Sequence, residues 1–163
     1  AVLPAISDST IADSLAAFQG TWRRFEYKGK TARGAGVYDD YAHHPTAVKE
    51  TLRALRAKVS GKIIVAFHPH LYSRTRDLFS DFSTAFAAAD KVLIAPIYAA
   101  REENDGSISS EILATRIRAT GTDAIALDSF DAIEHVLREA GESDTIMTMG
   151  AGDIYKVADK SIV

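Results

Sequence analysis

The sequence contains no cysteine in its 163 residues. This absence excludes disulfide bonds and thiolate metal sites, and it agrees with the cytoplasmic location that we expect. No apolar run approaches the roughly 20 residues that cross a bilayer, so we expect no membrane span. A formal net charge of -3 argues against non-specific nucleic-acid binding. What is present is a globular composition, 47% hydrophobic and 25% charged, with enough apolar residues for one domain and its core.

Short apolar runs alternate with helical patterns along most of the chain. The expected strands cover residues 35–38, 63–67, 92–95, 124–127 and 145–149. Helical patterns follow them, the first from Pro45 and the next as one helix that carries Leu78 and Phe86. Such alternation is typical of βαβ units with right-handed crossovers. We therefore predict a Rossmann-like three-layer α/β domain: a mostly parallel sheet of about six strands, with helices on both faces.

The first 38 residues differ from this alternation. The apolar spacing in residues 1–20 predicts one helix, which is capped near Ser7 and ended by Gly20. We therefore place a domain boundary at Gly20. The chain begins without Met, and we expect residues 1–20 to end a preceding domain or to form a linker helix. Residues 21–38 read as extended, with a turn at Lys28-Gly29-Lys30 and an antiparallel edge strand. We expect Arg23-Arg24 to lie on the solvated face of that strand.

Polar side chains gather where the expected strands end. Asp39, Asp40, Tyr41, His43 and His44 follow one run, and His68, His70, Arg74 and Arg76 follow the next. Tyr98, Arg101, Asp128 and residues 150–153 follow the others. Because the carboxyl ends of parallel strands meet at one edge, we expect these groups to share a rim. Guanidinium groups match carboxylate or phosphate oxygens, so the rim predicts an anionic substrate that carries a nucleotide.

Other motifs fit less well. Gly29-Lys30-Thr31 resembles the end of a P-loop, but Arg24 stands where its first glycine belongs. A dinucleotide fingerprint at Gly150 has Tyr155 in place of its third glycine. A metallohydrolase using the His/Asp rim and a stand-alone nucleotide-binding module stay open as alternatives, although adjacent histidines point apart and we predict no metal site. His44 has an alternative role as a helix cap, and His68 as a structural histidine.

Four strings carry a resemblance to a known family. They cover residues 19–26, 69–77 and 150–154 together with the specific string Asp39-Asp40-Tyr41-Ala42-His43-His44-Pro45-Thr46. In this order, over nearly the whole chain, they resemble the C-terminal domain of the Mur ligases of peptidoglycan synthesis. The resemblance is to the members that join L-alanine to UDP-N-acetylmuramate. One departure is Leu71, where some members have a second arginine.

The resemblance implies an ATP-dependent, amide-forming ligase with three domains. One domain holds the UDP-sugar, a central ATPase domain carries the P-loop, and the third closes over both. Residues 1–20 then look like the end of the central domain and residues 21–163 like the C-terminal domain. ATP and Mg²⁺ serve the full-length enzyme, with Mg²⁺ ligands mainly outside this chain. We expect this chain alone to be inactive, and we expect UDP-N-acetylmuramate, L-alanine, ATP and the two other domains as its partners.

The resemblance also implies roles for individual residues. Asp40 matches an acidic residue at the nucleotide ribose, so Asp40 and Tyr41 are expected to bind ATP. Tyr41 and His43 are expected to face the γ-phosphate and the amino acid, with His43 as the catalytic candidate. Arg74 is expected to anchor the carboxylate of L-alanine. Asp39, His44, His70 and Arg76 are secondary candidates.

Overall fold

The structure is a computed structural model that describes residues 6–18 and 20–163. Its centre is a six-stranded sheet in the order β1-β2-β6-β3-β4-β5. β1 (Glu26–Lys30) pairs antiparallel with β2 (Gly36–Asp40), whereas β6 (Thr145–Met149), β3 (Ile63–Phe67), β4 (Lys91–Ile94) and β5 (Asp123–Ala126) continue from β2 in parallel. The predicted mostly parallel sheet with an antiparallel edge strand is confirmed.

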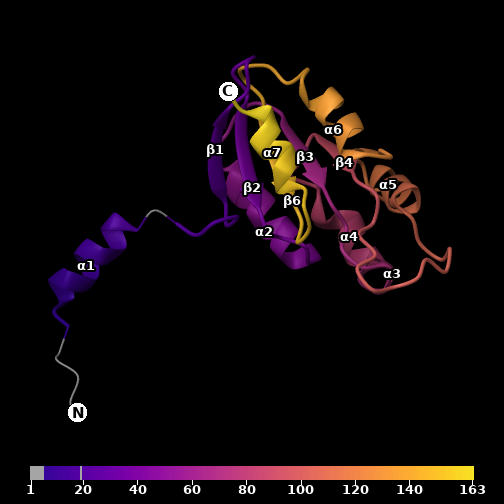
Figure 1. Cartoon of the computed structure of the whole chain (residues 1–163), viewed down its shortest axis with the longest axis horizontal. Coiled ribbons are helices and arrows are strands. Elements are labelled where there is room, and N and C mark those ends of the chain that lie inside the picture. Colours follow the sequence, from indigo (N-terminus) through magenta and orange to yellow (C-terminus); the bar gives the residue numbers. More distant parts are fainter. Residues whose placement is uncertain (1–5, 19) are drawn as a thin grey trace, which may run out of the picture.

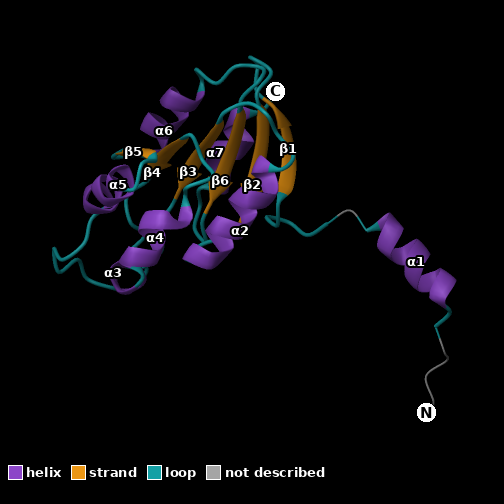
Figure 2. Cartoon of the chain, turned by 180° about the vertical axis from the view of Figure 1, so that it is seen from behind, coloured by secondary structure: helices purple, strands orange, loops and turns teal. Residues whose placement is uncertain are grey.

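Helices cover both faces of the sheet (Figure 2). One face carries α2 (Pro45–Arg56), α4 (Phe79–Ala85) and α5 (Ser110–Ala119), and the other carries α6 (Phe130–Leu137) and α7 (Tyr155–Ser161). The side chains of β3 alternate between the two cores: Val65 and Phe67 lie in the first, and Ala66 lies in the second. A strand buried on both faces needs the continuous apolar run that the sequence has here.

Helix α1 (Asp8–Ala17) stands apart from the sheet (Figure 1). The Ser7 side chain accepts a hydrogen bond from the Thr10 backbone N–H and caps the helix, as predicted. No residue of α1 is buried. Leu15 in the helix is 70% exposed, and Phe18, directly after the helix, is 65% exposed. The helix is therefore confirmed, although it ends at Ala17, with Phe18 as its C-cap, and not at Gly20 as predicted. Its assignment to a preceding domain stays a prediction.

Two local predictions were wrong. Lys28-Gly29-Lys30 is not a turn but the second half of β1, where the pairing with β2 shifts between Tyr27 and Gly29. The chain reverses at residues 31–35, where Thr31 accepts hydrogen bonds from the N–H groups of Gly34 and Ala35. A β-bulge accepts glycine as readily as a turn does, so glycine alone did not locate the reversal.

The second correction concerns the helix expected around Leu78 and Phe86. The chain instead forms α3 (Tyr72–Asp77) and α4, separated at Leu78. The last helix, expected through Val157, continues to Ser161. Among residues 6–18 and 20–163, no helix has both the length and the apolar character needed to cross a bilayer.

Candidate functional site

As predicted, strands end together at one edge of the sheet, which we call the rim. Part of this rim is a topological switch point. Asp40 of β2 and Phe67 of β3 both pair with Met149 of β6, so the three strands end at the same level. The helix after β3 packs on one face of the sheet and the helix after β6 on the other. Crevices at such points are where open α/β sheets bind ligands. The turn after Asp40 and the segment after Phe67 therefore leave the same edge of the sheet, on either side of the end of β6.

The two aspartates of the turn face inward. Asp40 is 7% exposed, and its Oδ1 and Oδ2 accept hydrogen bonds from the N–H groups of Ala42 and Phe25, both at 2.7 Å. Asp39 is fully buried and accepts hydrogen bonds from Arg23 at 2.7 Å and from Thr148 at 2.5 Å. Both carboxylates thus hold the turn in shape. The expected contact of Asp40 with a nucleotide stays a prediction.

Four predicted site residues come together beyond this turn. The ring of His43 lies 5.3 Å from that of Tyr41 and 6.3 Å from that of His70, between ring centroids. His70 Nδ1 lies 3.3 Å from a guanidinium nitrogen of Arg74, which begins the second turn of α3. All four side chains are half-buried, a state that leaves polar atoms accessible. The turn after β2 and helix α3 therefore meet in one cluster, as predicted.

Arg23 corrects the expectation that the arginine pair is solvated. Only Arg24 is exposed, with its guanidinium 5.1 Å from the Tyr41 ring centroid. Arg23 is 2% exposed and donates hydrogen bonds to Asp39 and to the carbonyls of Gly150 and Gly152, at 2.7, 2.6 and 2.9 Å. Burial is tolerated because the guanidinium has a paired charge and several acceptors. Arg23 therefore ties the segment before β1 to the loop after β6.

His68 lies beneath that loop. It is 6% exposed, its Nδ1 has no hydrogen-bond partner, and burial lowers the pKa of its imidazole to about 4, with a smaller contribution from His70. A Cβ at Gly152 would lie 2.7 Å from His68 Nδ1, and one at Gly150 would lie 2.7 Å from the His68 carbonyl oxygen. The loop packs this closely only because both residues are glycine. His68 accordingly fits the structural role that was its alternative.

Two secondary candidates lie outside the cluster. His44 is the N-cap of α2, and its Nδ1 accepts a hydrogen bond from the Thr46 N–H at 3.4 Å, as its alternative role predicted. Arg76 is exposed and forms ion pairs with Asp77 and Asp105, at 3.2 and 3.1 Å. Neither side chain is brought to the group formed by Tyr41, His43, His70 and Arg74.

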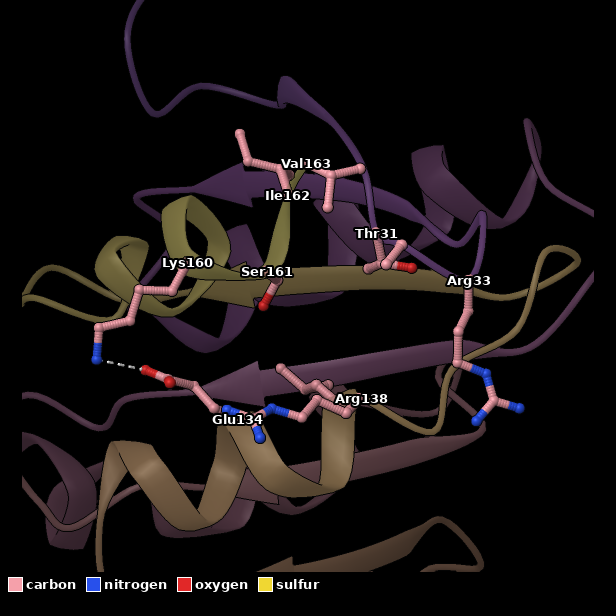
Figure 3. Close-up of a pocket in the computed structure, with 10 residues that line it drawn as sticks. Thr31, Arg33, Glu134, Arg138, Lys160, Ser161, Ile162 and Val163 are labelled. Carbon is pink, nitrogen blue, oxygen red and sulfur yellow. Dashed lines mark hydrogen bonds and ion pairs between the residues drawn. The ribbon is translucent and has the colours of Figure 1, made fainter.

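Hollows occur at both ends of the sheet. At the rim, a hollow of about 480 Å³ is lined by residues that include His68, Tyr98 and Phe130. At the opposite end, a hollow of about 390 Å³ lies between the turn after β1 and the ends of α6 and α7. Lys160 and Glu134 in its lining form an ion pair at 2.9 Å, and Figure 3 shows how these side chains lie. No predicted site residue lines this second hollow. The predicted site residues that come together therefore lie at the rim and not at this second hollow.

Metal binding gains no support from the described parts of the chain. Within residues 6–18 and 20–163, no three His, Asp or Glu side chains form a group that could hold a metal ion. The carboxylates of Asp39 and Asp40 already accept hydrogen bonds inside the domain. The metallohydrolase alternative is accordingly not favoured.

Comparison with known proteins identifies the family. The family described as "Mur ligase, glutamate ligase domain" matches residues 23–152. The chain belongs to the Mur ligase family. It is 47% identical over 154 residues to the UDP-N-acetylmuramate–L-alanine ligase of Acetivibrio thermocellus, an alignment that covers 94% of this chain and 33% of the relative. For the enzyme of the same name from Caldanaerobacter subterraneus, the identity is 47% over 144 residues, covering 88% and 31%. This Mur ligase chain thus spans about one third of the length of the curated relatives that it matches.

Solved structures of Mur ligases share the fold. The UDP-N-acetylmuramate–alanine ligase of Thermotoga maritima matches with a TM-score of 0.75 and 24% identity, over 93% of this chain and 32% of that one. A murein peptide ligase of Psychrobacter arcticus matches with a TM-score of 0.69 and 24% identity, over 93% and 31%. At this identity the likeness supports the architecture described above.

Two residues at the rim of this Mur ligase domain escaped the sequence-based prediction of the site. Arg23 was placed on a solvated face, and Glu102 was not considered. Glu102 accepts hydrogen bonds from the Ser73 N–H, at 2.9 Å, and from the Ser73 hydroxyl. No local pattern marks these residues, because each contact joins segments that are at least 16 positions apart.

Proposed function

We propose that this chain is the C-terminal domain of an ATP-dependent ligase that joins L-alanine to UDP-N-acetylmuramate in peptidoglycan synthesis. The observation that carries the proposal is the meeting of Tyr41, His43, His70 and Arg74 at one edge of the sheet. The names of the relatives, which are ligases of this kind, support the same substrates. In the full-length protein the domain would close over ATP and orient the amino acid.

Arg74 is the proposed anchor for the carboxylate of L-alanine. Its guanidinium offers several N–H donors, and no carboxylate among residues 6–18 and 20–163 forms an ion pair with it. An anchored carboxylate fixes the direction in which the amine approaches the reacting carbonyl. His43 lies between Tyr41 and His70, where it would face the amino acid and the phosphate that leaves. Donors at this place stabilise the oxyanion that develops during acyl transfer.

ATP supplies the phosphoryl group that activates the substrate carboxylate when it is bound. Tyr41 and the buried Asp40 are the proposed contacts with the nucleotide, and the exposed Arg24 stacked on Tyr41 adds a positive charge beside them. Within residues 6–18 and 20–163, no group of three or more His, Asp or Glu side chains could hold a metal ion. As the family resemblance implies, we propose that Mg²⁺ is bound mainly by the other two domains. We also propose that the ligase acts in the cytoplasm.

The experiment is a ligation assay on the full-length protein that contains this chain. With ATP, Mg²⁺, UDP-N-acetylmuramate and L-alanine, we expect ADP, phosphate and the L-alanyl product in equal amounts. Omitting any one substrate should stop phosphate release. Turnover that does not need UDP-N-acetylmuramate, or that needs a different amino acid, would contradict the proposed substrates.

A further inference from the structure

Helix α3, which carries Arg74, is poorly able to hold its own position. It has six residues, and its N-cap Leu71 makes no side-chain capping bond and has a φ of 73°. A left-handed backbone angle costs free energy for a residue other than glycine. Helices this short are not stable by themselves in water. The orientation of Arg74 must therefore be set by contacts from outside α3.

The loop after β4 supplies the first of these contacts. His70 and Tyr98 form a parallel bridge, in which the Tyr98 N–H donates to the Pro69 carbonyl at 2.9 Å and the Leu71 N–H donates to the Tyr98 carbonyl at 2.8 Å. The Tyr98 ring also lies against the His70 ring, with 5.2 Å between centroids and an interplanar angle of 36°. The residue before α3 is thus held by both backbone and side chain.

Glu102 supplies a second contact from the same loop. Its carboxylate accepts hydrogen bonds from the N–H and the hydroxyl of Ser73, in the first turn of α3. These bonds lower the pKa of the Glu102 carboxyl, with the hydroxyl contributing most. The carboxylate is therefore ionised at neutral pH, where it replaces the capping group that Leu71 lacks.

His70 makes the last contact in this chain of support. Its Nδ1 is 3.3 Å from a guanidinium nitrogen of Arg74. A guanidinium has only donors, so this contact requires His70 to accept, which a neutral imidazole protonated on Nε2 can do. The His43 ring lies on the open side of His70, 6.3 Å away. Arg74 is thus steered by a histidine that is itself held by Tyr98.

We propose that His70 is a positioning residue that aims the Arg74 guanidinium at the carboxylate of the amino acid, and that Tyr98 and Glu102 hold this arrangement. The inference rests on the proposed function and deepens it. It assigns the orientation of the amino acid to the loop after β4, which acts through His70 and Arg74 and not by direct contact with a substrate. Replacing His70 should weaken amino-acid binding and leave the nucleotide and the UDP-sugar unaffected.

Acid should have the same effect as replacing His70. Burial lowers the pKa of the imidazole, and the charges of Arg74 and His43 lower it further, whereas Glu102 opposes them. His68 from the same segment and the phenol of Tyr98 complete the titratable groups around it. His70 is therefore neutral at pH 7, and protonation below its lowered pKa would remove the acceptor and add a positive charge beside Arg74.

The test uses the full-length ligase and compares His70→Ala with His70→Asn. The amide oxygen of asparagine can occupy the place of Nδ1, so this variant should keep the KM for L-alanine within about threefold. His70→Ala should raise that KM about tenfold, as expected for the loss of a hydrogen bond to a charged group, with kcat and the KM for ATP unchanged. His135→Asn, on the exposed face of α6, is the matched control and should change nothing.

Three further measurements separate positioning from a merely structural role. In an Arg74→Ala background, adding His70→Ala should change the KM for L-alanine less than twofold, because His70 acts through Arg74. Tyr98→Phe should behave as the wild type, whereas Tyr98→Ala should raise the same KM. Between pH 8 and pH 5.5 the KM should rise more steeply in the wild type than in His70→Asn.

The inference would be overturned by a His70→Ala enzyme whose KM for L-alanine is unchanged. It would also be overturned if kcat and the melting temperature fell and the KM values for all three substrates rose together, as expected for general damage to the fold. A wild-type enzyme that forms no L-alanyl product contradicts the proposed function itself, and the inference with it. Normal turnover without the selective change in KM contradicts the inference alone.

Discussion

At the scale of single residues, His68 makes the stability of the rim depend on pH. Its imidazole is buried, lacks a partner at Nδ1 and has a pKa of about 4 against an ordinary 6.5. The folded-state pKa lies below the unfolded-state value, so the unfolded chain takes up the proton first as the pH falls. Stability present above pH 6.5 is therefore lost between pH 6.5 and pH 4.

We predict that His68 alone removes about 3 kcal/mol from the free energy of unfolding between pH 7 and pH 4. Denaturant unfolding of this chain at several pH values measures the effect. His68→Leu and His68→Gln, which cannot titrate, should show a shallower pH dependence than the wild type. His135→Gln is the exposed control and should follow the wild type. Equal slopes for the wild type and both His68 variants would disprove the prediction.

Arg23 is a second residue that matters for the stability of the rim, and replacing it should lower the free energy of unfolding. Arg23→Met would leave the Asp39 carboxylate buried without its charged partner and free the Gly150 and Gly152 carbonyls. Removing one member of a buried ion pair costs about 3–5 kcal/mol, so we expect that decrease in the free energy of unfolding. Arg24→Met, at the exposed neighbour, should cost less than about 1 kcal/mol. Similar costs for the two variants would show that the buried pair contributes little.

Single residues were predictable where a local rule governs them. Ser7 before α1 and His44 before Pro45 cap their helices as their positions suggest. Arg23 was not predictable, because its burial depends on carbonyls that are 127 and 129 positions away in the sequence. The inward direction of Asp39 likewise depends on distant partners, Arg23 and Thr148.

Among the elements, α1 stands out because it buries no residue. Its 10 residues are fewer than the about 12–15 that an isolated helix needs for stability in water. We predict that removing residues 1–20 changes the free energy of unfolding by less than about 1 kcal/mol. Amide hydrogen exchange in α1 should be as fast as in an unfolded peptide. Strong protection of α1, or a large loss of stability on truncation, would contradict this expectation.

A deletion at the other end is the control for α1. Helix α7 buries Val157 and Ala158 in the second core, so removing residues 155–163 should destabilise the domain strongly. If both deletions had the same small effect, burial would not explain the difference between the two helices.

Most elements could be predicted because their periodicity matches their environment. β3 is a continuous apolar run between two helix layers, and α2 has apolar residues at helical spacing. The errors fall where two structures share one residue preference. Gly29 suits a bulge as well as a turn, and the break at Leu78 has neither glycine nor proline to announce it. Tertiary packing decides such positions.

At the scale of the whole molecule, our proposal is that the domain supplies only part of a catalytic site. The cluster of Tyr41, His43, His70 and Arg74 would orient the amino acid, whereas the sequence has no complete P-loop to hold ATP phosphates. We predict that this chain alone forms no L-alanyl product from ATP, UDP-N-acetylmuramate and L-alanine. The full-length protein assayed in parallel is the control. Turnover by residues 1–163 alone would contradict the division of the site among domains.

The central claim is that the turn after β2 and helix α3 form one amino-acid site with Arg74 as the carboxylate anchor. Steady-state kinetics of Arg74→Ala in the full-length ligase tests it most directly, with Arg116→Ala on the exposed side of α5 as the matched control. We predict that Arg74→Ala raises the KM for L-alanine about 100-fold, leaves the KM for ATP within about twofold, and that Arg116→Ala changes neither. A folded Arg74→Ala enzyme with an unchanged KM for L-alanine would contradict the account.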